Sequence, residues 1–407
     1  MKEKLVVTGN GMAGMRTVEE LIQSAPAEYE ITIFGAEPYG NYNRIMLTPV
    51  LYGAKNIDDI MIHDLNWYKE NQVKLHCGAG KNVVDVDRKE RMVISEDGMR
   101  VKYDRLLIAT GSSPFMVPIP GYETEGVMGF RDIADVEAMI EKAKTKQHAV
   151  ILGGGLLGLE AASGLMKRGM DVTVVNRGEN LLSLQLDEVA ANILKVELEQ
   201  TGISFRMGVT IKEIISTKGH ISRVIFSDKT EHPADILIMA TGVRPNKQLA
   251  EKMGLHCEKG IVVNSVMQTF DPRIYSVGEC VQHRGELFGL VAPVYEQAKV
   301  CANHLAGHGV AGFKTLIAAT ILKVTEINLF SMGNYRGDDT TESITLQDFA
   351  LNIYRKIVIR DNKIVGVVLY GDTTDSGWYM ELFKKESDVS KFREQLIFGK
   401  PQKAEAI

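Results

Sequence analysis

One glycine motif occurs twice in this 407-residue chain, each time directly after a short apolar run. The first copy reads GNGMAG at residues 9–14 and follows residues 5–7, and the second reads GGGLLG at residues 153–158 and follows residues 150–152. In a GxGxxG motif the first glycine permits a tight turn, the second lets the backbone approach a pyrophosphate, and the third lets a helix pack on a strand. The phosphates lie at a helix N-terminus, where unpaired N–H groups favour negative charge. The duplication therefore predicts two bound nucleotides.

The residues that follow each motif support this prediction. A second apolar strand ends near Glu37 after the first motif and at Asn176 after the second. Both positions are close to the roughly 20-residue spacing at which a side chain meets the adenosine ribose. Each unit also closes on a similar string, LLIATG at residues 106–111 and LIMATG at residues 237–242. A single GxGxxG is weak evidence, but this repeated context predicts two Rossmann-like domains.

Two segments that disfavour regular structure, residues 112–121 and 243–246, mark crossings between the predicted domains. We therefore expect an α/β fold with two Rossmann-like dinucleotide-binding domains, one inserted in the other, and a C-terminal α+β domain. The expected boundaries are residues 1–112 and 245–314 for the first dinucleotide-binding domain, 113–244 for the inserted domain, 315–400 for the C-terminal domain and 401–407 for a tail.

Local patterns predict further elements. An apolar stripe predicts a helix over residues 133–144, and strand meanders are expected to turn at residues 97–98 and near Asp228. Beyond residue 315 the pattern predicts strands at residues 322–324, 344–346, 356–359 and 365–370, with a helical tail from about Met380.

The composition limits the class of protein. Hydrophobic residues make up 45% of the chain and charged residues 24%, which is ordinary globular usage. The net charge of −5 provides no basic surface for nucleic acid. No apolar run reaches the roughly 20 residues that span a bilayer, and residues 1–15 lack the basic region and cleavage site of an export signal. We therefore expect a cytoplasmic protein that binds neither nucleic acid nor membrane.

The four cysteines, Cys77, Cys257, Cys280 and Cys301, stand far apart and form no CxxC pair. This spacing argues against a zinc site, an iron–sulfur site and a sequence-local redox disulfide. We therefore expect no metal.

Longer strings carry a resemblance to a known family: YNRIMLTP at residues 42–49, LLIATGSSP at 106–114, ATGVRP at 240–245, IYSVGEC at 274–280 and VVLYGDTTD at 367–375. The chain resembles flavoprotein reductases with two dinucleotide-binding domains, and most closely the flavoprotein module at the N-terminal end of the large subunit of NAD(P)H-dependent nitrite reductase. NADH:rubredoxin and ferredoxin reductases are relatives. The resemblance covers essentially the whole chain and implies an FAD-dependent NAD(P)H oxidoreductase of nitrate assimilation.

Carried over by position, the resemblance implies FAD on the first unit. The glycines would hold its pyrophosphate, Glu37 its adenosine ribose, Arg44 its phosphates or flavin edge, and Glu279 its ribityl chain. Backbone N–H groups near residues 290–296 would face the pyrimidine side of the flavin and stabilise negative charge on it. The implied FAD-binding residues are Gly9, Gly11, Met12, Ala13, Gly14, Glu37, Arg44, Ala109, Thr110, Gly111, Gly278, Glu279, Val291 and Ala292.

The second unit would bind NADH or NADPH. Glu160 would lie near the nicotinamide and the flavin as the catalytic candidate, although a charged residue solvated in a first helical turn is the plainer interpretation. Asn176 can bond a ribose hydroxyl, and Arg177 can pair with a 2′-phosphate or point to water, so the coenzyme stays open with a slight preference for NADH from the family. The implied residues are Gly153, Gly155, Leu156, Leu157, Gly158, Glu160, Asn176, Arg177 and Gly242.

The chain departs from the family's disulfide reductases. Residues 41–47 contain no cysteine, which excludes a dithiol relay at that place. Thr48 and Pro49 stand where many ferredoxin reductases have a lysine paired with the acid at Glu160. The sequence reaches Ile407 without the iron–sulfur segment and sirohaem domain of nitrite reductase subunits. We therefore expect electrons to pass to a separate acceptor.

The expected acceptor is a sirohaem nitrite reductase component, a rubredoxin or a ferredoxin. The C-terminal domain is the expected docking or homodimer surface, and its segment 372–379 either folds back toward the flavin or is purely structural. Two alternatives remain at this point: a flavin-based redox sensor or scaffold with little turnover, and an NAD(P)H oxidase.

Overall fold

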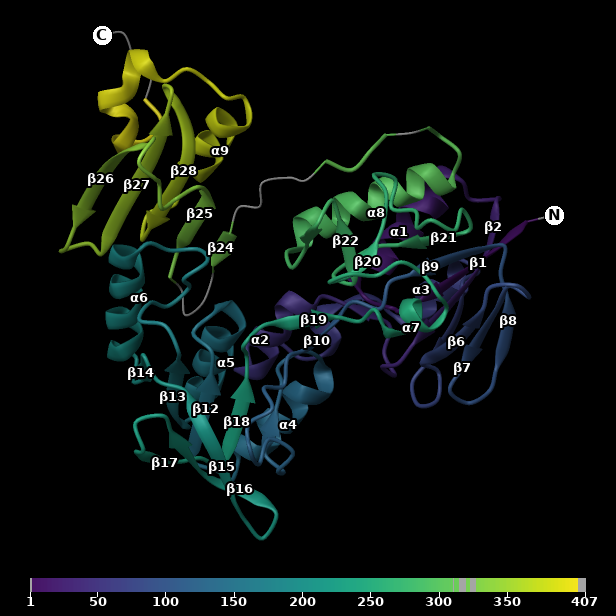
Figure 1. Cartoon of the computed structure of the whole chain (residues 1–407), viewed down its shortest axis with the longest axis horizontal. Coiled ribbons are helices and arrows are strands. Elements are labelled where there is room, and N and C mark those ends of the chain that lie inside the picture. The colour runs from purple at the N-terminus through teal and green to yellow at the C-terminus, as the bar shows by residue number, and fades with distance from the viewer. Residues whose placement is uncertain (1, 310, 315–319, 323–326, 402–407) are drawn as a thin grey trace. The chain divides into compact units, whose positions relative to one another are not determined.

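The computed structural model describes residues 2–309, 311–314, 320–322 and 327–401 (Figure 1). The chain forms two compact units by its internal contacts: residues 1–114, 131–133 and 243–316 in unit 1, and residues 115–130, 134–242 and 317–407 in unit 2. This division groups the C-terminal segment with the middle of the chain, so the three-domain boundaries stay a prediction.

Unit 1 is built on a five-stranded sheet in which every neighbouring pair is parallel. Its strands, in spatial order, are β21 (Ile274–Ser276), β9 (Arg105–Ile108), β1 (Glu3–Thr8), β2 (Tyr29–Gly35) and β5 (Lys74–Cys77). Helices α1 (Met12–Ser24) and α8 (Val291–Leu305) pack against each other beside the sheet (Figure 1). Since parallel strands are covered on both faces, they read as continuous apolar runs, and Leu5, Val6 and Val7 are all buried.

Unit 2 repeats this arrangement with its own five-stranded parallel sheet. Its strands, in spatial order, are β11 (Val127–Met128), β18 (Ile236–Met239), β12 (His148–Leu152), β13 (Asp171–Asn176) and β14 (Ser204–Met207). Helix α5 (Leu156–Lys167) follows β12, and α6 (Glu188–Gln200) follows β13. The helix predicted at residues 133–144 is α4 (Ile133–Ala143).

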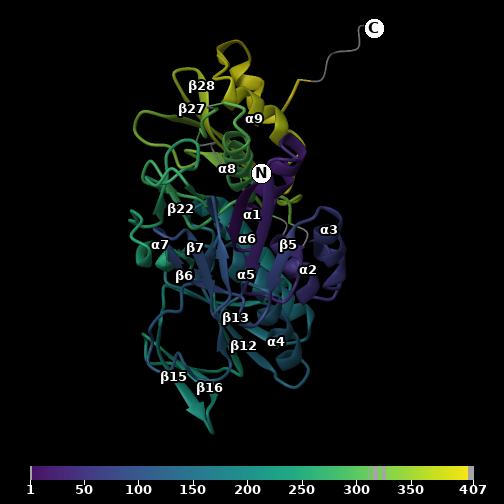
Figure 2. The ribbon, with the colours of Figure 1, turned by 90° about the vertical axis from the view of Figure 1, so that its right-hand side faces the viewer.

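Each parallel sheet is accompanied by an antiparallel meander, as the turn signals predicted. In unit 1 it consists of β6 (Val83–Asp87), β7 (Met92–Ser95) and β8 (Arg100–Lys102); in unit 2, of β15 (Ile211–Thr217), β16 (His220–Phe226) and β17 (Glu231–Pro233). Figure 2 shows the β15–β16 hairpin as a projecting ribbon. The two predicted crossing segments pair with each other as antiparallel strands β10 (Ser112–Pro114) and β19 (Val243–Pro245).

The C-terminal segment forms an antiparallel five-stranded sheet. It contains β24 (Thr320–Leu322), β25 (Leu329–Gly333), β26 (Glu342–Asp348), β27 (Ile353–Arg360) and β28 (Lys363–Tyr370), followed by α9 (Ser376–Lys384) and η3 (Ser390–Phe398). Most of the strand predicted at residues 322–324 lies outside the described residues.

The remaining elements are short. They are β3 (Asn41–Tyr42), η1 (Arg44–Met46), α2 (Leu47–Leu51), η2 (Asp58–Ile60), β4 (Met61–His63), α3 (Leu65–Glu70), α7 (Gln248–Lys252), β20 (Ile261–Val262), β22 (Val281–His283) and β23 (Glu286–Leu287). Within the described ranges, no helix has both the length and the apolar composition needed to cross a bilayer.

Candidate cofactor sites

The three glycines of the first motif have different surroundings. Gly9 has a φ of +108°, and a Cβ there would collide with the carbonyl oxygen of Ala109. A Cβ on Gly14 would lie 2.9 Å from both the Ala109 Cβ and the Gly9 oxygen. At Gly11, in contrast, a Cβ would meet no atom within 4 Å. Two glycines therefore allow the turn to pack, and Gly11 faces open space in which a phosphate group fits.

The second motif repeats this geometry. Gly153 has a φ of +125° and sits against the carbonyl oxygen of Ala240, and a Cβ on Gly158 would collide with the Gly153 oxygen. A Cβ on Gly155 would meet nothing within 4 Å. Ala109 and Ala240, which belong to the repeated closing strings, thus have the same packing role in the two units.

Three helices begin without a capping side chain at the places where cofactor contacts are expected. The residues before their first turns are Gly11 for α1, Gly155 for α5 and Leu290 for α8, and none of these first turns contains an acidic residue. Helix α6, by comparison, is capped by Asp187, whose carboxylate accepts from the Ala190 N–H at 3.1 Å. Uncapped N–H groups and an absence of negative charge suit a bound anion. Both nucleotide sites therefore fit a dinucleotide pyrophosphate.

Glu37 is held in place by two side chains from the segment that follows it. The Tyr42 hydroxyl donates to its Oε2 at 2.6 Å, and the Arg44 guanidinium forms an ion pair with its Oε1. Arg44 also donates to the backbone oxygen of Arg131 at 2.9 Å. Burial, together with the Glu37 charge, raises the pKa of Tyr42, so this hydroxyl remains a donor. The predicted ribose acid is thus fixed before any ligand arrives.

The structure brings the IYSVGEC string at residues 274–280 beside the first glycine motif. Gly278 has a φ of +96°, and a Cβ there would lie 2.9 Å from the Cβ of Ala13 in α1. Glu279 accepts from the Ser112 hydroxyl at 2.8 Å and forms an ion pair with Arg131. Sequence reasoning missed Arg131, whose partner lies 148 positions away along the chain.

Asn10, between the first two glycines, was also missed. Its Oδ1 accepts from the Tyr68 hydroxyl at 2.8 Å, and its Nδ2 donates to the Tyr39 oxygen at 3.1 Å. The Asn41 side chain donates to the Asn10 backbone oxygen at 3.1 Å. These bonds attach the glycine turn to the segment that contains Glu37. The only sequence signal was a polar residue inside an otherwise apolar turn.

The strand registers show that Glu37 and Asn176 do not occupy equivalent positions. Gly9 donates to the Phe34 oxygen and Gly153 to the Val175 oxygen, each at 2.8 Å. Asn176 therefore corresponds to Gly35, the residue after Phe34, and Glu37 corresponds to Gly178. The spacing argument treated the two residues as counterparts because it could not see where each strand meets its glycine turn.

The amide of Asn176 is engaged within the protein. Its Oδ1 accepts from the Gly154 N–H at 3.1 Å, and its Nδ2 donates to the oxygens of Gly178 at 2.9 Å and Asn180 at 3.2 Å. Arg177, next to it, is exposed, and no ion pair of its side chain occurs in the described part of the chain. The charged side chain next to the second glycine turn is therefore the unpaired guanidinium of Arg177.

The other predicted residues of the second unit lie along α5 and at the end of β18. Leu156 and Leu157 are in the first turn of α5, and Glu160 follows in the second turn, where it is half-buried. Gly242 has a φ of +111° and accepts from the Phe115 N–H at 2.9 Å. On α8, Val291 and Ala292 are the first two helical residues, as the predicted contact through backbone N–H groups requires.

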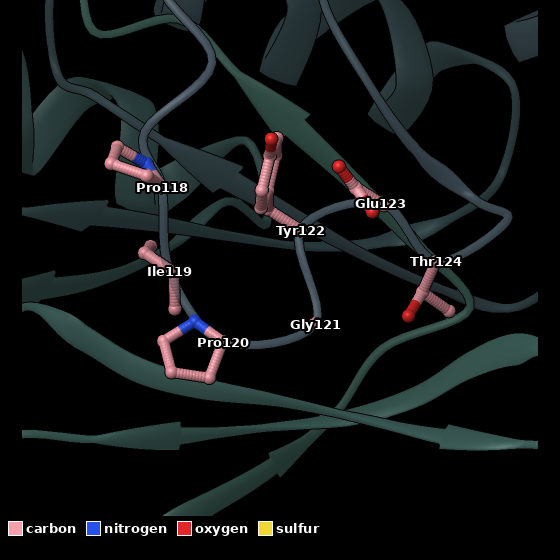
Figure 3. Close-up of a pocket in the computed structure, with 7 residues that line it drawn as sticks. All are labelled: Pro118, Ile119, Pro120, Gly121, Tyr122, Glu123 and Thr124. Atoms are coloured by element: carbon pink, nitrogen blue, oxygen red, sulfur yellow. The ribbon is translucent and has the colours of Figure 1, made fainter.

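Two hollows lie apart from the predicted residues. One, of about 530 Å³, is lined by residues 118–124 of the crossing segment (Figure 3). The other, of about 900 Å³, is lined partly by Asp372 and Asp375. Asp372 forms an ion pair with Arg355 and accepts from the Thr374 hydroxyl at 2.7 Å, which supports a structural role for segment 372–379.

Among the described residues no cluster of His, Cys, Asp and Glu could hold a metal ion.

Comparisons with known proteins agree with this geometry. Residues 3–304 match the family described as pyridine nucleotide-disulphide oxidoreductase, and residues 319–387 match the C-terminal domain of rubredoxin NAD+ reductase. The chain is 43% identical to "Nitrite reductase [NAD(P)H]" of Bacillus subtilis over 390 residues, which are 96% of this chain and 48% of that protein. It is 41% identical to the "Assimilatory nitrate reductase electron transfer subunit" of the same species, over 97% of this chain and 51% of that protein. The chain thus spans about half the length of these curated relatives.

Among solved structures, a ferredoxin reductase from Rhodopseudomonas palustris superposes with a TM-score of 0.85 at 21% identity, over 97% of this chain and all of the other. At that identity the match shows the fold alone. The family match is more specific, because it covers both glycine motifs and the string that contains Glu279. The chain belongs to the pyridine nucleotide-disulphide oxidoreductase family.

Proposed function

We propose that the glycine turn of unit 1 holds FAD and that of unit 2 holds NADH or NADPH. Support comes from the residues around the turns: unit 1 adds an acid at Glu37 and a second string at Gly278 and Glu279, whereas unit 2 adds the cation Arg177. In this proposal the nicotinamide-binding domain is inserted into the FAD-binding domain through the paired strands β10 and β19.

In this arrangement the protein binds the two cofactors and orients them. Bound FAD would supply the redox chemistry, namely hydride transfer from the nicotinamide and electron transfer onward. The first turns of α1 and α5 hold the two pyrophosphates, Gly11 and Gly155 let the backbone approach them, and Glu37 orients the adenosine ribose. Glu279 holds the ribityl chain, and Arg131 forms an ion pair with its carboxylate. The N–H groups of Val291 and Ala292 stabilise negative charge on the flavin.

The acceptor is a separate molecule, because the chain lacks the cysteine pair that disulfide reductases of this family have near residues 41–47. Residues 41–47 contain no cysteine, and the thiols of Cys280 and Cys301 are buried. Burial raises the pKa of both, which disfavours the thiolate form that redox exchange requires. The absence of a cysteine relay is the observation that carries the proposal of an electron-transfer component. It also disfavours a cysteine-dependent oxidase.

We propose a nitrite reductase component as the acceptor, because both Bacillus subtilis relatives are named for nitrite or nitrate reduction. Rubredoxin and ferredoxin are the runners-up, since the C-terminal segment matches the corresponding domain of rubredoxin NAD+ reductase. The C-terminal sheet is the proposed docking or homodimer surface.

Stopped-flow spectroscopy tests this function. The FAD-loaded protein is reduced with NADH or NADPH, and its reoxidation is followed with a sirohaem nitrite reductase, a rubredoxin, a ferredoxin or O₂. Fast reoxidation by a protein carrier supports the proposal. Fast reoxidation by O₂ alone would make the protein an oxidase, and a long-lived reduced complex that no acceptor reoxidises would make it a sensor.

A further inference from the structure

Beside the proposed FAD site lies a buried side-chain amide whose oxygen has a hydrogen-bond partner and whose nitrogen has none among the described residues. Gln297, on the second turn of α8, has an exposed fraction of 0%. Its Oε1 accepts from the Gly278 N–H at 2.8 Å. Its Nε2, equally buried, has no hydrogen-bond partner among the described residues. Buried side-chain donors are normally satisfied, so each exception requires an explanation.

The orientation of this amide follows from its one hydrogen bond. The Gly278 N–H can only donate, so it requires the carbonyl oxygen of Gln297 and not the NH₂ group. Nε2 therefore points to the other side and presents N–H donors there. A buried donor left unpaired is unfavourable, and a ligand that accepts from it gains in affinity.

The position of Gln297 indicates which acceptor it serves. Its partner Gly278 lies against Ala13, which is in the first turn of α1, and α1 and α8 pack directly on each other. The same first turn begins at Gly11, where the backbone faces open space and the N–H groups have no capping side chain. A pyrophosphate at this turn offers only acceptor oxygens, which are what Nε2 lacks.

We propose that Gln297 is a cofactor-binding residue whose Nε2 donates a hydrogen bond to the pyrophosphate of FAD. Its Oε1 simultaneously fixes Gly278, so one side chain connects the two FAD-binding strings. This proposal rests on the assignment of FAD to unit 1 and is independent of the electron acceptor.

Gln282 provides a matched control because it is a buried glutamine of the same unit with every group paired. Its Oε1 accepts from the N–H groups of Lys259 at 2.8 Å and Gly260 at 3.1 Å, and its Nε2 donates to Glu258 at 2.5 Å. Substitution by glutamate preserves the accepting oxygen at both positions. At Gln282 the second oxygen would face the Glu258 carboxylate, so the control combines Q282E with E258Q, whose NH₂ group can donate to the new oxygen. Only at Gln297 does the substitution direct a second oxygen toward the proposed pyrophosphate.

The test measures FAD binding to full-length apoprotein by flavin fluorescence, together with the ³¹P NMR spectrum of the bound cofactor. Q297E should weaken FAD binding by about 10- to 100-fold, the range for losing a hydrogen bond to a charged group, and should shift a pyrophosphate resonance. The E258Q/Q282E control should leave both readings close to those of the unsubstituted protein. Native affinity and unchanged ³¹P shifts in Q297E would overturn the proposal.

Two further measurements cover the remaining outcomes. Q297M keeps the side-chain volume and should weaken binding in the same direction if Q297E does not fold. In unsubstituted protein with ¹⁵N-labelled glutamine, FAD should shift one side-chain amide signal, and the absence of any shifted amide signal would overturn the proposal. If the unsubstituted protein binds no FAD, the assignment of FAD to unit 1 fails as well, which separates the two failures.

Discussion

At the scale of single residues, the two proposed nucleotide sites differ in whether their charged side chain already has an ion-pair partner. Glu37 is paired with Arg44 and accepts from Tyr42. Arg177 has no ion-pair partner within the described ranges. A paired acid is oriented to accept from ribose hydroxyls, whereas an unpaired cation attracts a phosphate. This difference supports the proposal that FAD binds beside Glu37 and that NADH or NADPH binds beside Arg177.

Glu37→Gln is expected to weaken FAD binding by about 10- to 100-fold, because the amide bonds a ribose hydroxyl less strongly and leaves Arg44 without its partner. Titration of apoprotein with FAD, followed by flavin fluorescence, measures the change. Tyr42→Phe removes only one donor to Glu37 and should have a smaller effect. Unchanged FAD affinity in Glu37→Gln would remove Glu37 from the site.

Arg177→Ala is expected to raise the KM for NADPH by about tenfold or more while changing the KM for NADH little, because only NADPH presents a 2′-phosphate to the guanidinium. Steady-state reduction of ferricyanide with each coenzyme provides the comparison. Arg223→Ala, which removes an exposed arginine paired with Glu231 on the meander, is the matched control. Equal changes in KM for both coenzymes would show that Arg177 does not bind the 2′-phosphate of NADPH.

The residues that sequence reasoning found are those whose role is local. Gly9 and Gly14 follow from backbone geometry within one turn, and any GxGxxG turn requires them. Arg131, Asn10 and Gln297 were missed because their partners come from distant segments, such as Glu279 for Arg131. A single sequence contains no signal for which distant segments meet, so these contacts could not be predicted.

At the scale of elements, the two strand–turn–helix units follow from periodicity and turn chemistry. The continuous apolar runs correctly predicted buried strands such as β1 and β12. The register between β13 and the second glycine turn could not be predicted, since it depends on the Gly153 hydrogen bond to Val175. That register places Asn176 opposite Gly154 and makes its amide structural.

Gly11 and Gly155, where a Cβ would meet no atom within 4 Å, permit a test of the two turns by identical substitutions. Gly11→Ala should abolish FAD binding, and Gly155→Ala should retain FAD but abolish its reduction by NAD(P)H, because each methyl group occupies space reserved for a phosphate. Neither should lower the free energy of unfolding of the apoprotein by more than about 1 kcal/mol, since both residues have extended backbones that alanine adopts. Absorbance spectra and denaturant unfolding measure both properties.

Gly14→Ala is the contrasting control in this series. Its Cβ would lie 2.9 Å from the Gly9 oxygen, so this variant should be destabilised even without a cofactor. FAD binding that survives in Gly11→Ala would contradict the assignment of the first turn to a phosphate site.

At the scale of whole units, the C-terminal sheet is attached to α6 by hydrogen bonds to carboxylates. The Tyr354 hydroxyl donates to Asp187 at 2.7 Å, Lys356 forms an ion pair with the same residue at 3.3 Å, and the Tyr370 hydroxyl donates to Glu197. Both tyrosines are buried, and burial raises the pKa of each. Pattern reasoning predicted β26, β27 and β28 but missed β25, and it could not predict that this sheet groups with unit 2.

Buried tyrosines also determine how the units respond to alkali. Tyr68 in unit 1 is 2% exposed and Tyr379 in unit 2 is 0% exposed, and burial raises the pKa of each to about 12. In an unfolded chain a tyrosine ionises near pH 10. Between about pH 10 and pH 12 the unfolded state therefore loses protons that the folded state retains, so the free energy of unfolding falls as pH rises. The contribution is fully present below pH 10 and is lost progressively above it, at up to about 1.4 kcal/mol per pH unit for each group.

Urea unfolding at pH 9, 10 and 11 measures this dependence, and Tyr379→Phe separates it from the loss of a hydrogen bond. The Tyr379 hydroxyl donates to the Leu396 oxygen at 2.7 Å, so the variant should be less stable by about 1 kcal/mol at pH 9. Its stability should nevertheless fall less steeply toward pH 11, because one ionisable group has been removed. A variant that lost stability with the same slope as the unsubstituted protein would show that Tyr379 titrates normally in the fold, and burial would then not govern its pKa.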